Sequence, residues 1–165
     1  MAVNDRLKRY LDHEGVAYAT APHREAFTAH EVAVESHVAE RQLAKVLVVR
    51  EREGGEHLMV VLPAACRLDL AALRRAAGRH RLALVPEAEM ARLFPDCEVG
   101  AMPPFGALYG MPVYVDACFP RSELIAFQAG NHHEVMRMPY AEYERLAKPR
   151  VAEFCLHERE KSIAE

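Results

Sequence analysis

The sequence is poor in the side chains that act as nucleophiles in hydrolases. Its 165 residues include only three serines, Ser36, Ser122 and Ser162, and two threonines, Thr20 and Thr28. No serine lies in the G-x-S-x-G pattern that presents the nucleophile of α/β-hydrolases. The composition therefore argues against a serine hydrolase.

Signatures of bound cofactors and metals are also missing. The chain has neither a G-x-x-x-x-G-K-[ST] loop nor a G-x-G-x-x-G segment after a strand. Its nine histidines include no H-E-x-x-H pattern, and the adjacent pair His132 and His133 would point to opposite faces of an extended segment. Only His30 and His37, seven residues apart, could meet on a helical face. We expect no cofactor and no metal.

The cysteines form no C-x-x-C pair, which is typical of buried thiols rather than of a zinc or redox motif. Cys97 stands three residues before an unusual loop, but its neighbours Asp96 and Glu98 would disfavour a thiolate. The four cysteines are far apart in the chain: Cys66, Cys97, Cys118 and Cys155.

Charge and hydropathy limit the possible partners. Lys and Arg number 21 against 24 Asp and Glu, a net charge of −3, which argues against an extended nucleic-acid groove but not against contact with the end of a nucleic acid. The start, MAVNDRLKRYL, lacks the apolar run of a signal peptide. No apolar stretch reaches the roughly 18 residues of a membrane helix. We expect a cytoplasmic protein without a membrane partner.

Helical and strand patterns alternate along the whole chain without a repeat or a composition shift. We therefore predict a single α/β domain over 1–165, with a mixed, twisted β-sheet surrounded by helices, a core over about 6–154 and a charged tail over 155–165. Helices are predicted over 4–15, 27–38, 70–78, 87–94 and 140–147. Strands are predicted over 16–21, 44–50, 57–62, 81–85, 112–117, 124–130 and 134–139, with a hairpin turn at Gly54 and Gly55.

Several helix ends carry local signals. Thr28 and Glu31 have the spacing of a capping box, and Phe27 with Val32 have that of a hydrophobic staple. Asn4 or Asp5 is expected to cap the first helix, which Gly15 would end, and Asp69 and Pro86 are expected to open two later helices.

The segment CEVGAMPPFGALYGMP, residues 97–112, is nearly uncharged and contains three glycines and three prolines. Glycine lets a backbone approach a ligand closely, and Pro103 with Pro104 restricts motion. Such a loop can present N–H groups to a developing oxyanion, or it can simply connect two strands. Lys45, which heads an apolar strand, is either an ordinary solvent-facing residue or a fixed cation for a phosphate or a negatively charged intermediate.

Four segments, AKVLVVR, GAMPPFGALYG, FQAGNHHEV and YAEYERL, together resemble the YbaK / prolyl-tRNA-synthetase-associated domain family of aminoacyl-tRNA editing domains. The similarity extends from about Arg6 to Phe154. The free-standing length resembles the members that act in trans on mischarged tRNA.

The resemblance implies which residues form the site. The G-x-x-x-P motif matches Gly100 to Pro104, including Ala101 and Met102, whose backbone would hold the ester carbonyl and terminal ribose. Lys45 would lie near the phosphate or ribose of the 3′-terminal nucleotide. The remaining implied residues border the aminoacyl pocket: Phe27, Thr28, His30, Ala129, Gly130, Asn131 and His132.

The resulting hypothesis is a trans-acting deacylase that hydrolyses the ester of a mischarged tRNA, with Ala-tRNA or Cys-tRNA for proline as the leading substrate. Backbone groups and substrate hydroxyls would position the water. An aminoacyl-tRNA synthetase or an elongation factor is an expected further partner. Pro103, which removes one N–H from the motif, leaves open a catalytically inactive binding module of the same fold, and a hydrolase that uses Cys97 is a third alternative.

Overall fold

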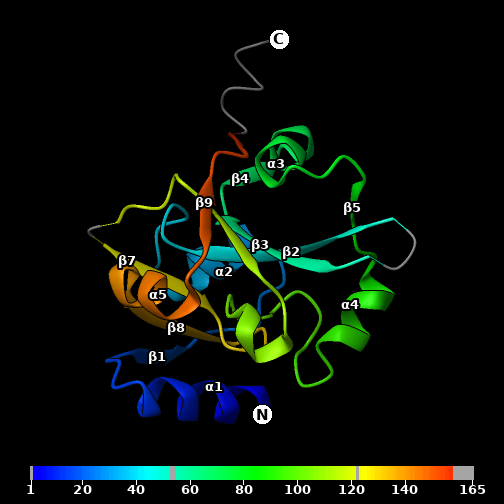
Figure 1. The fold of residues 1–165 in the computed structure, drawn as a ribbon. Helices are drawn as coiled ribbons and strands as arrows, with labels where there is room; N and C mark the ends of the chain where they lie inside the picture. Colours follow the sequence, from blue (N-terminus) through cyan, green and yellow to red (C-terminus); the bar gives the residue numbers. More distant parts are fainter. Residues whose placement is uncertain (1, 53–54, 122, 158–165) are drawn as a thin grey trace.

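The computed structural model describes residues 2–52, 55–121 and 123–157 (Figure 1). No helix in these ranges is both long and apolar enough to cross a membrane. The helices are α1 (Ala2–His13), α2 (Ala29–Ser36), α3 (Leu70–Ala77), α4 (Glu87–Leu93) and α5 (Tyr140–Ala147), with a short 3₁₀ helix η1 (Gly106–Tyr109). The strands are β1 (Ala19–Pro22), β2 (Ala44–Glu51), β3 (His57–Pro63), β4 (Cys66–Leu68), β5 (Leu82–Leu84), β6 (Val113–Asp116), β7 (Leu124–Gln128), β8 (Glu134–Pro139), β9 (Arg150–Ala152) and β10 (Cys155–His157).

The strands divide among three sheets. The largest has the order β5-β2-β3-β6-β9, with antiparallel pairs among β5, β2 and β3 and parallel pairs from β3 through β6 to β9. An antiparallel sheet has the order β1-β8-β7, and β10 pairs with β4. The predicted α/β domain with a mixed sheet is confirmed, but the division of the strands into three sheets was not predicted.

The central strands are apolar because both faces of the large sheet are covered. On β2, Val46 and Val48 face one cluster of buried side chains, whereas Leu47 and Val49 face a second. The first cluster includes residues of α1, α4, α5, β7 and β8, and the second includes residues of α3 and β4. Figure 1 accordingly shows α1 and α3 at opposite ends of the molecule.

A third, smaller cluster fixes α2. Val32 and Ala33 of α2 pack with Leu43, Ala126 and Val135, so the helix is held against the start of β2 and the antiparallel sheet. In Figure 1 this helix lies behind β2 and β3. Its first turn is therefore held beside β7 and β8.

Most capping signals are borne out. The hydroxyl of Thr28 accepts the N–H of Glu31, and the Glu31 carboxylate accepts the N–H of Thr28, which completes the capping box. The Asp69 carboxylate accepts the N–H of Ala72 at the start of α3. The expected cap at Asn4 or Asp5 is wrong, because α1 begins at Ala2.

The short strands were missed. β4, β9 and β10 have three residues each, and β10 takes up the first residues of the expected C-terminal tail. The remainder of that tail lies outside the described residues. The β2–β3 hairpin is confirmed, but Gly54 of its predicted turn also lies outside them.

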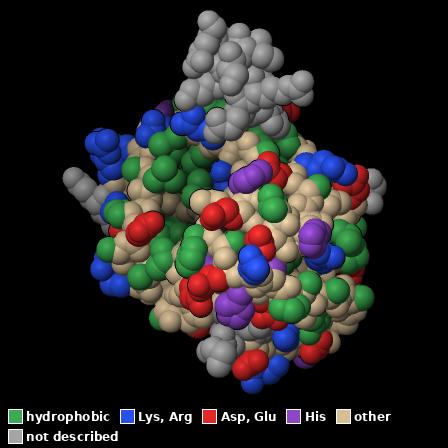
Figure 2. All heavy atoms as spheres, turned by 180° about the vertical axis from the view of Figure 1, so that it is seen from behind, with side chains coloured by type: hydrophobic (Ala, Val, Ile, Leu, Met, Phe, Trp, Pro, Cys, Tyr) green, Lys and Arg blue, Asp and Glu red, His purple; other side chains and the backbone are tan. Residues whose placement is uncertain are grey.

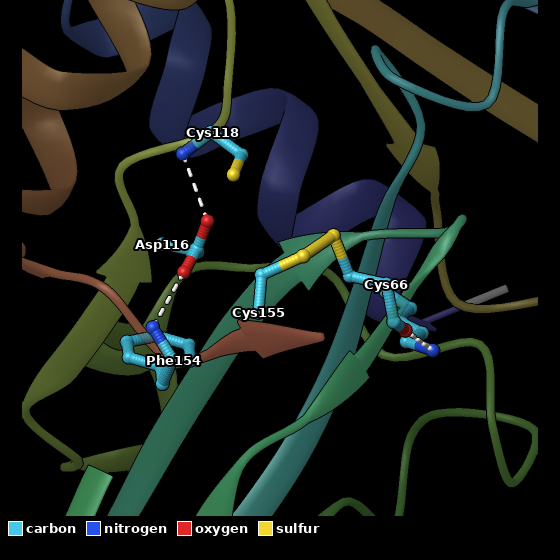
Figure 3. Close-up of a disulfide and its surroundings, with 6 residues drawn as sticks. Cys66, Asp116, Cys118, Phe154 and Cys155 are labelled. Carbon is cyan, nitrogen blue, oxygen red and sulfur yellow. Dashed lines mark hydrogen bonds between the residues drawn. A yellow bond between two sulfur atoms is a disulfide. The ribbon is translucent and has the colours of Figure 1, made fainter. Parts of the chain in front are cut away.

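The expectation of four buried thiols is wrong. Cys66 and Cys155 form a disulfide between β4 and β10 (Figure 3). Cys97 is partly buried and Cys118 is exposed, both as thiols. The bridge joins residues 89 positions apart, so no spacing pattern could have indicated it.

Candidate active site

The glycine–proline loop is held against the segment that follows β7 by main-chain hydrogen bonds. The N–H of Glu98 donates to the carbonyl of Gly130 at 2.8 Å, and the N–H of Gly130 donates to the carbonyl of Ala101 at 2.9 Å. Gly130 has φ +100°, a left-handed conformation that favours glycine. The fold therefore brings together two segments of the predicted site that are thirty residues apart.

Gly100 is the exposed turn of this loop, and it is followed by residues that enter the core. Its φ of +89° again favours glycine, whereas Ala101 is fully buried and Met102 is 4% exposed. Further on, the buried Tyr143 hydroxyl donates to the carbonyl of Pro104 at 2.9 Å. The loop is thus fixed on both sides of a solvent-facing backbone corner.

The N–H of Gly100 is directed at a weak acceptor. It lies 3.3 Å from the Sδ of Met102, and thioether sulfur is a poor hydrogen-bond acceptor. An incoming carbonyl oxygen or oxyanion would form a stronger bond with this group. The Gly100 N–H can therefore exchange its contact with the Met102 sulfur for a hydrogen bond to a ligand at little cost in free energy.

His132 is held beside Gly100 in one orientation. Its backbone N–H donates to the Glu98 carboxylate at 3.1 Å, and its Nε2 lies 2.8 Å from the carbonyl of Val99. A carbonyl only accepts, so Nε2 carries the proton of the neutral ring and Nδ1 is the acceptor. A Cβ at Gly100 would stand 3.5 Å from the His132 ring, which shows how close the two residues are.

The Nδ1 atom of His132 is buried and has no hydrogen-bond partner among the described residues. The whole residue is only 6% exposed. Buried acceptors are nearly always satisfied, so an acceptor left open here is a candidate contact for a substrate hydroxyl, an amine or a water. Among the predicted site residues, His132 Nδ1 is therefore the clearest candidate for a hydrogen bond with a ligand.

The start of α2 forms the adjoining wall. The Phe27 ring lies over His132 with a centroid distance of 4.8 Å, although Phe27 is 63% exposed. Thr28 is occupied by the capping box, where its N–H and hydroxyl, followed by the N–H of Phe27, hold the pKa of Glu31 below its usual value. Phe27 therefore contacts His132, and Thr28 follows it at the start of α2; a role for either residue in a substrate pocket stays a prediction.

Two predicted residues have other contacts. The Nδ1 of His30 lies 2.6 Å from the Glu40 carboxylate on the exposed side of α2. The Asn131 side chain closes its own turn, with Nδ2 donating to Glu134 and Oδ1 accepting the N–H of His133. Asn131 thereby shapes the segment that carries Gly130 and His132.

Lys45 lies on β2, and its hydrogen bond to the main chain goes to β4 rather than to Gly100 or His132. It is half-buried, and its Nζ donates to the backbone carbonyl of Cys66 at the start of β4. Ala64, in the turn before β4, packs against the α2 cluster that includes Val32. Phe27, just before α2, contacts His132, and the buried side of α2 shares a cluster with Ala64, two residues before Cys66.

The face that carries α2 is hollowed. Figure 2 shows this side from behind, with a depression in its upper half that is lined by hydrophobic side chains. Lysine or arginine side chains lie above the depression and acidic ones lie below it. An apolar floor with cations on one rim suits a small ester group attached to a phosphate-bearing chain.

A cavity of about 380 Å³ adjoins the loop, and its lining includes the predicted residues Gly130 and Asn131 together with Cys97 and Glu98. Burial, together with the nearby Asp96 carboxylate, raises the pKa of the Cys97 thiol to about 12. The Tyr109 hydroxyl, 3.3 Å from the sulfur, opposes this rise only in part. A thiol in this state is a poor nucleophile near neutral pH, which argues against the Cys97 hydrolase.

Sequence reasoning missed two residues that organise the site. Glu98 fixes the backbone of His132, and Tyr143 fixes that of Pro104. Glu98 lies in the segment 97–112 and Tyr143 in YAEYERL, but their partners His132 and Pro104 are 34 and 39 residues away, so the sequence did not indicate these contacts. The result is an α/β domain whose candidate site is lined by main-chain groups, a histidine and an apolar wall, and lacks a nucleophilic hydroxyl among these residues.

Comparison with known proteins identifies the family. Residues 23–146 match the aminoacyl-tRNA editing domain family. The chain is also 30% identical over 154 residues, or 92% of each chain, to the multifunctional Ser/Thr-tRNA deacylase ProXp-y of Escherichia coli K12, and equally to that of Escherichia coli O157:H7. The chain therefore belongs to the aminoacyl-tRNA editing domain family, a family of aminoacyl-tRNA deacylases.

Solved structures share the fold. The crystal structure of the hypothetical protein APE2540 has a TM-score of 0.81 at 20% identity and covers 91% of this chain and 99% of its own. A candidate trans-editing enzyme for prolyl tRNA synthetase has a TM-score of 0.79 at 22% identity, with 94% and 98% covered. At these identities the likeness establishes the architecture of the domain.

Proposed function

We propose that the protein acts in trans to hydrolyse the ester of a mischarged tRNA at the site formed by Gly100 and His132. The observation that carries this proposal is the pairing of the Gly100 N–H, which is bonded to a thioether at an exposed backbone corner, with a buried acceptor without a partner on the adjacent histidine. Together they offer one donor and one acceptor to the same small ligand. An ester with nearby hydroxyl groups matches both.

The chemistry needs no nucleophilic side chain. Water attacks the ester carbonyl, the carbonyl oxygen becomes an oxyanion, and the Gly100 N–H stabilises that charge. The bond to the ribose oxygen then breaks, the ribose oxygen takes the proton released by the water, and the products are the amino acid and the tRNA. His132 Nδ1 accepts a hydrogen bond from the water or from a substrate hydroxyl.

Lys45 is assigned to the terminal nucleotide. Its ammonium contacts the Cys66 carbonyl, and lysine binds phosphate as a point charge without a fixed geometry. The cations above the depression in Figure 2 support a path for the acceptor end of tRNA on this face. The net charge of −3 fits contact with an end rather than with a long helix.

The substrate is a small amino acid on a non-cognate tRNA. Alanine and cysteine on the proline tRNA remain the candidates from the sequence. Two observations add serine and threonine: the name of the Escherichia coli relative, and the open His132 acceptor, which a side-chain hydroxyl would satisfy. We propose action in the cytoplasm, with a synthetase or an elongation factor delivering the tRNA.

The test is deacylation of a panel of tRNAs charged with alanine, cysteine, serine and threonine. Wild type, Lys45→Ala and Lys8→Ala are compared, the last removing the same charge from α1. We expect hydrolysis of at least one mischarged tRNA by wild type and Lys8→Ala, and loss of activity in Lys45→Ala. Saturable tRNA binding without hydrolysis of any member would overturn the proposal in favour of the binding module.

A second variant tests whether the side chain of the substrate amino acid contacts His132. His132→Phe keeps an aromatic ring beside Phe27 but removes the acceptor. A substrate hydroxyl that loses its buried partner costs about 1–3 kcal/mol, or roughly 5- to 150-fold in rate. We expect that loss for serine and threonine and a smaller one for alanine. Equal losses for all four would exclude a side-chain contact with Nδ1.

A further inference from the structure

Three cysteines from three distant segments meet at the end of the large sheet. The Cys66–Cys155 disulfide joins β4 and β10, and Cys118 follows β6 by two residues. The sulfur atoms of Cys118 and Cys155 and a carboxylate oxygen of Asp116 all lie within 4.8 Å of one another. A thiol and a disulfide are therefore neighbours at this point (Figure 3).

Asp116 fixes their relative positions. It is 1% exposed, and its two carboxylate oxygens accept the N–H groups of Cys118 and Phe154, each at 2.8 Å. Figure 3 shows Asp116 between these two residues. Because Phe154 directly precedes Cys155, one buried carboxylate holds the backbone of the thiol and the backbone beside the disulfide.

The three cysteines differ in their exposure to solvent. Cys118 is exposed, Cys155 is half-buried, and Cys66 is 1% exposed. An attacking thiolate must reach a disulfide sulfur, so exchange begins at the more accessible end of the bridge. That end is Cys155, the one beside Cys118.

We propose that Cys118, Cys155 and Cys66 form a thiol–disulfide exchange site. The Cys118 thiolate attacks the sulfur of Cys155, a Cys118–Cys155 bond forms, and the Cys66–Cys155 bond breaks. The electron pair leaves on the sulfur of Cys66, which takes up one proton in place of the proton lost by Cys118. The exchange is internal and involves no net oxidation.

The exchange reaches Lys45 through Cys66. The Cys66 carbonyl accepts a hydrogen bond from the Lys45 ammonium. Cys66 begins β4, a three-residue strand that pairs with β10 and is bridged to it by the disulfide. Moving the bridge to Cys118 releases Cys66 and loosens the anchor of Lys45. The consequence for catalysis rests on the proposed function, whereas the exchange itself does not.

The experiment maps disulfides in the full-length protein by mass spectrometry. It uses a Cys97→Ser background, because trypsin leaves Cys97 and Cys118 on one peptide, residues 93–121. The other two peptides, 53–67 and 151–159, then carry one cysteine each. After incubation at pH 8 and an acid quench with a maleimide, we expect both cross-links, Cys66–Cys155 and Cys118–Cys155. Only the first at every time point would overturn the proposal.

A second variant keeps the proposal testable if the exchanged form is scarce. Cys66→Ser in the same background is treated with glutathione disulfide, which oxidises the two remaining thiols and is reduced to two glutathione molecules. We expect the Cys118–Cys155 bridge in protein whose circular dichroism matches the parent. Glutathione adducts without that bridge would contradict the proposed contact.

Labelling of Lys45 tests the coupling without reference to activity. A limiting amount of acetic anhydride is added to the Cys118→Ser protein, which keeps the original bridge, and to the Cys66→Ser protein in its exchanged form. We expect acetylation of Lys45 to rise severalfold in the exchanged form, with Lys8 unchanged as an internal reference. Equal labelling would refute the link to Lys45 and leave the exchange site to the mapping result.

Discussion

Substitution of Gly100 by alanine tests whether the loop backbone is the catalytic element. The added Cβ has room, since the nearest atom is 3.5 Å away on His132, so the cost comes from the backbone. With φ at +89°, a residue with a Cβ loses about 1–2 kcal/mol if the loop keeps its shape. If the loop relaxes instead, the Gly100 N–H turns away from its present direction.

A matched control exists at Gly78, which ends α3. Its φ is +66°, no heavy atom lies within 4 Å of a built Cβ, and it stands outside the candidate site. Gly78→Ala should therefore cost the same 1–2 kcal/mol. For a domain of this size each kcal/mol lowers Tm by about 2–4 °C, so both variants should melt about 2–8 °C below wild type.

Only Gly100→Ala should affect the reaction. Removal of one oxyanion-stabilising donor costs about 10²- to 10³-fold in kcat, and a misdirected N–H is equivalent to its removal. Thermal melts of both variants and single-turnover deacylation with the best substrate of the panel provide the comparison. Wild-type rates in Gly100→Ala, with the same Tm loss as Gly78→Ala, would refute a catalytic role for this N–H.

Three further outcomes are expected. Hydrogen bonds from Arg50, and then from His57, lower the pKa of Glu89 to about 2. Its stabilising effect is therefore complete above about pH 4.5 and is lost as pH falls towards 2, so Glu89→Gln should flatten that part of an acid-unfolding profile. Reduction of the Cys66–Cys155 bridge, which closes a loop of about 90 residues, should lower the free energy of unfolding by about 4.6 kcal/mol on the chain-entropy estimate, measured by urea denaturation with and without dithiothreitol. Cys97→Ala should keep wild-type deacylation, and a large loss would restore the thiol mechanism.

Features encoded in adjacent residues could be predicted from the sequence. The capping box of Thr28 and the Asp69 cap are local, and the apolar runs of β2 and β3 follow from burial on both faces. The strands β4 and β10 could not be predicted in this way. Each has three residues and exists only because the other lies beside it, nearly ninety positions away.

The same distinction applies to the candidate site. The glycines and prolines of the loop are visible in the sequence, and so is the histidine pair. The contacts that give them a role are not, because Glu98, Gly130 and His132 meet through tertiary structure. The disulfide is the extreme case, since four scattered cysteines allow several pairings and the pattern favoured none.

A site made of backbone groups depends on the fold in a way that a catalytic triad does not. The N–H of Gly100 is a main-chain group, so no side chain can take its place. Its direction is set by the hydrogen bonds to Gly130 and by that of Tyr143 to Pro104. Variation in the loop sequence should therefore be tolerated wherever those bonds survive, including at the buried Pro103. Loss of the Tyr143 hydroxyl, 39 residues from Pro104, should impair the reaction more than an equally destabilising change in α3, because it frees the corner itself.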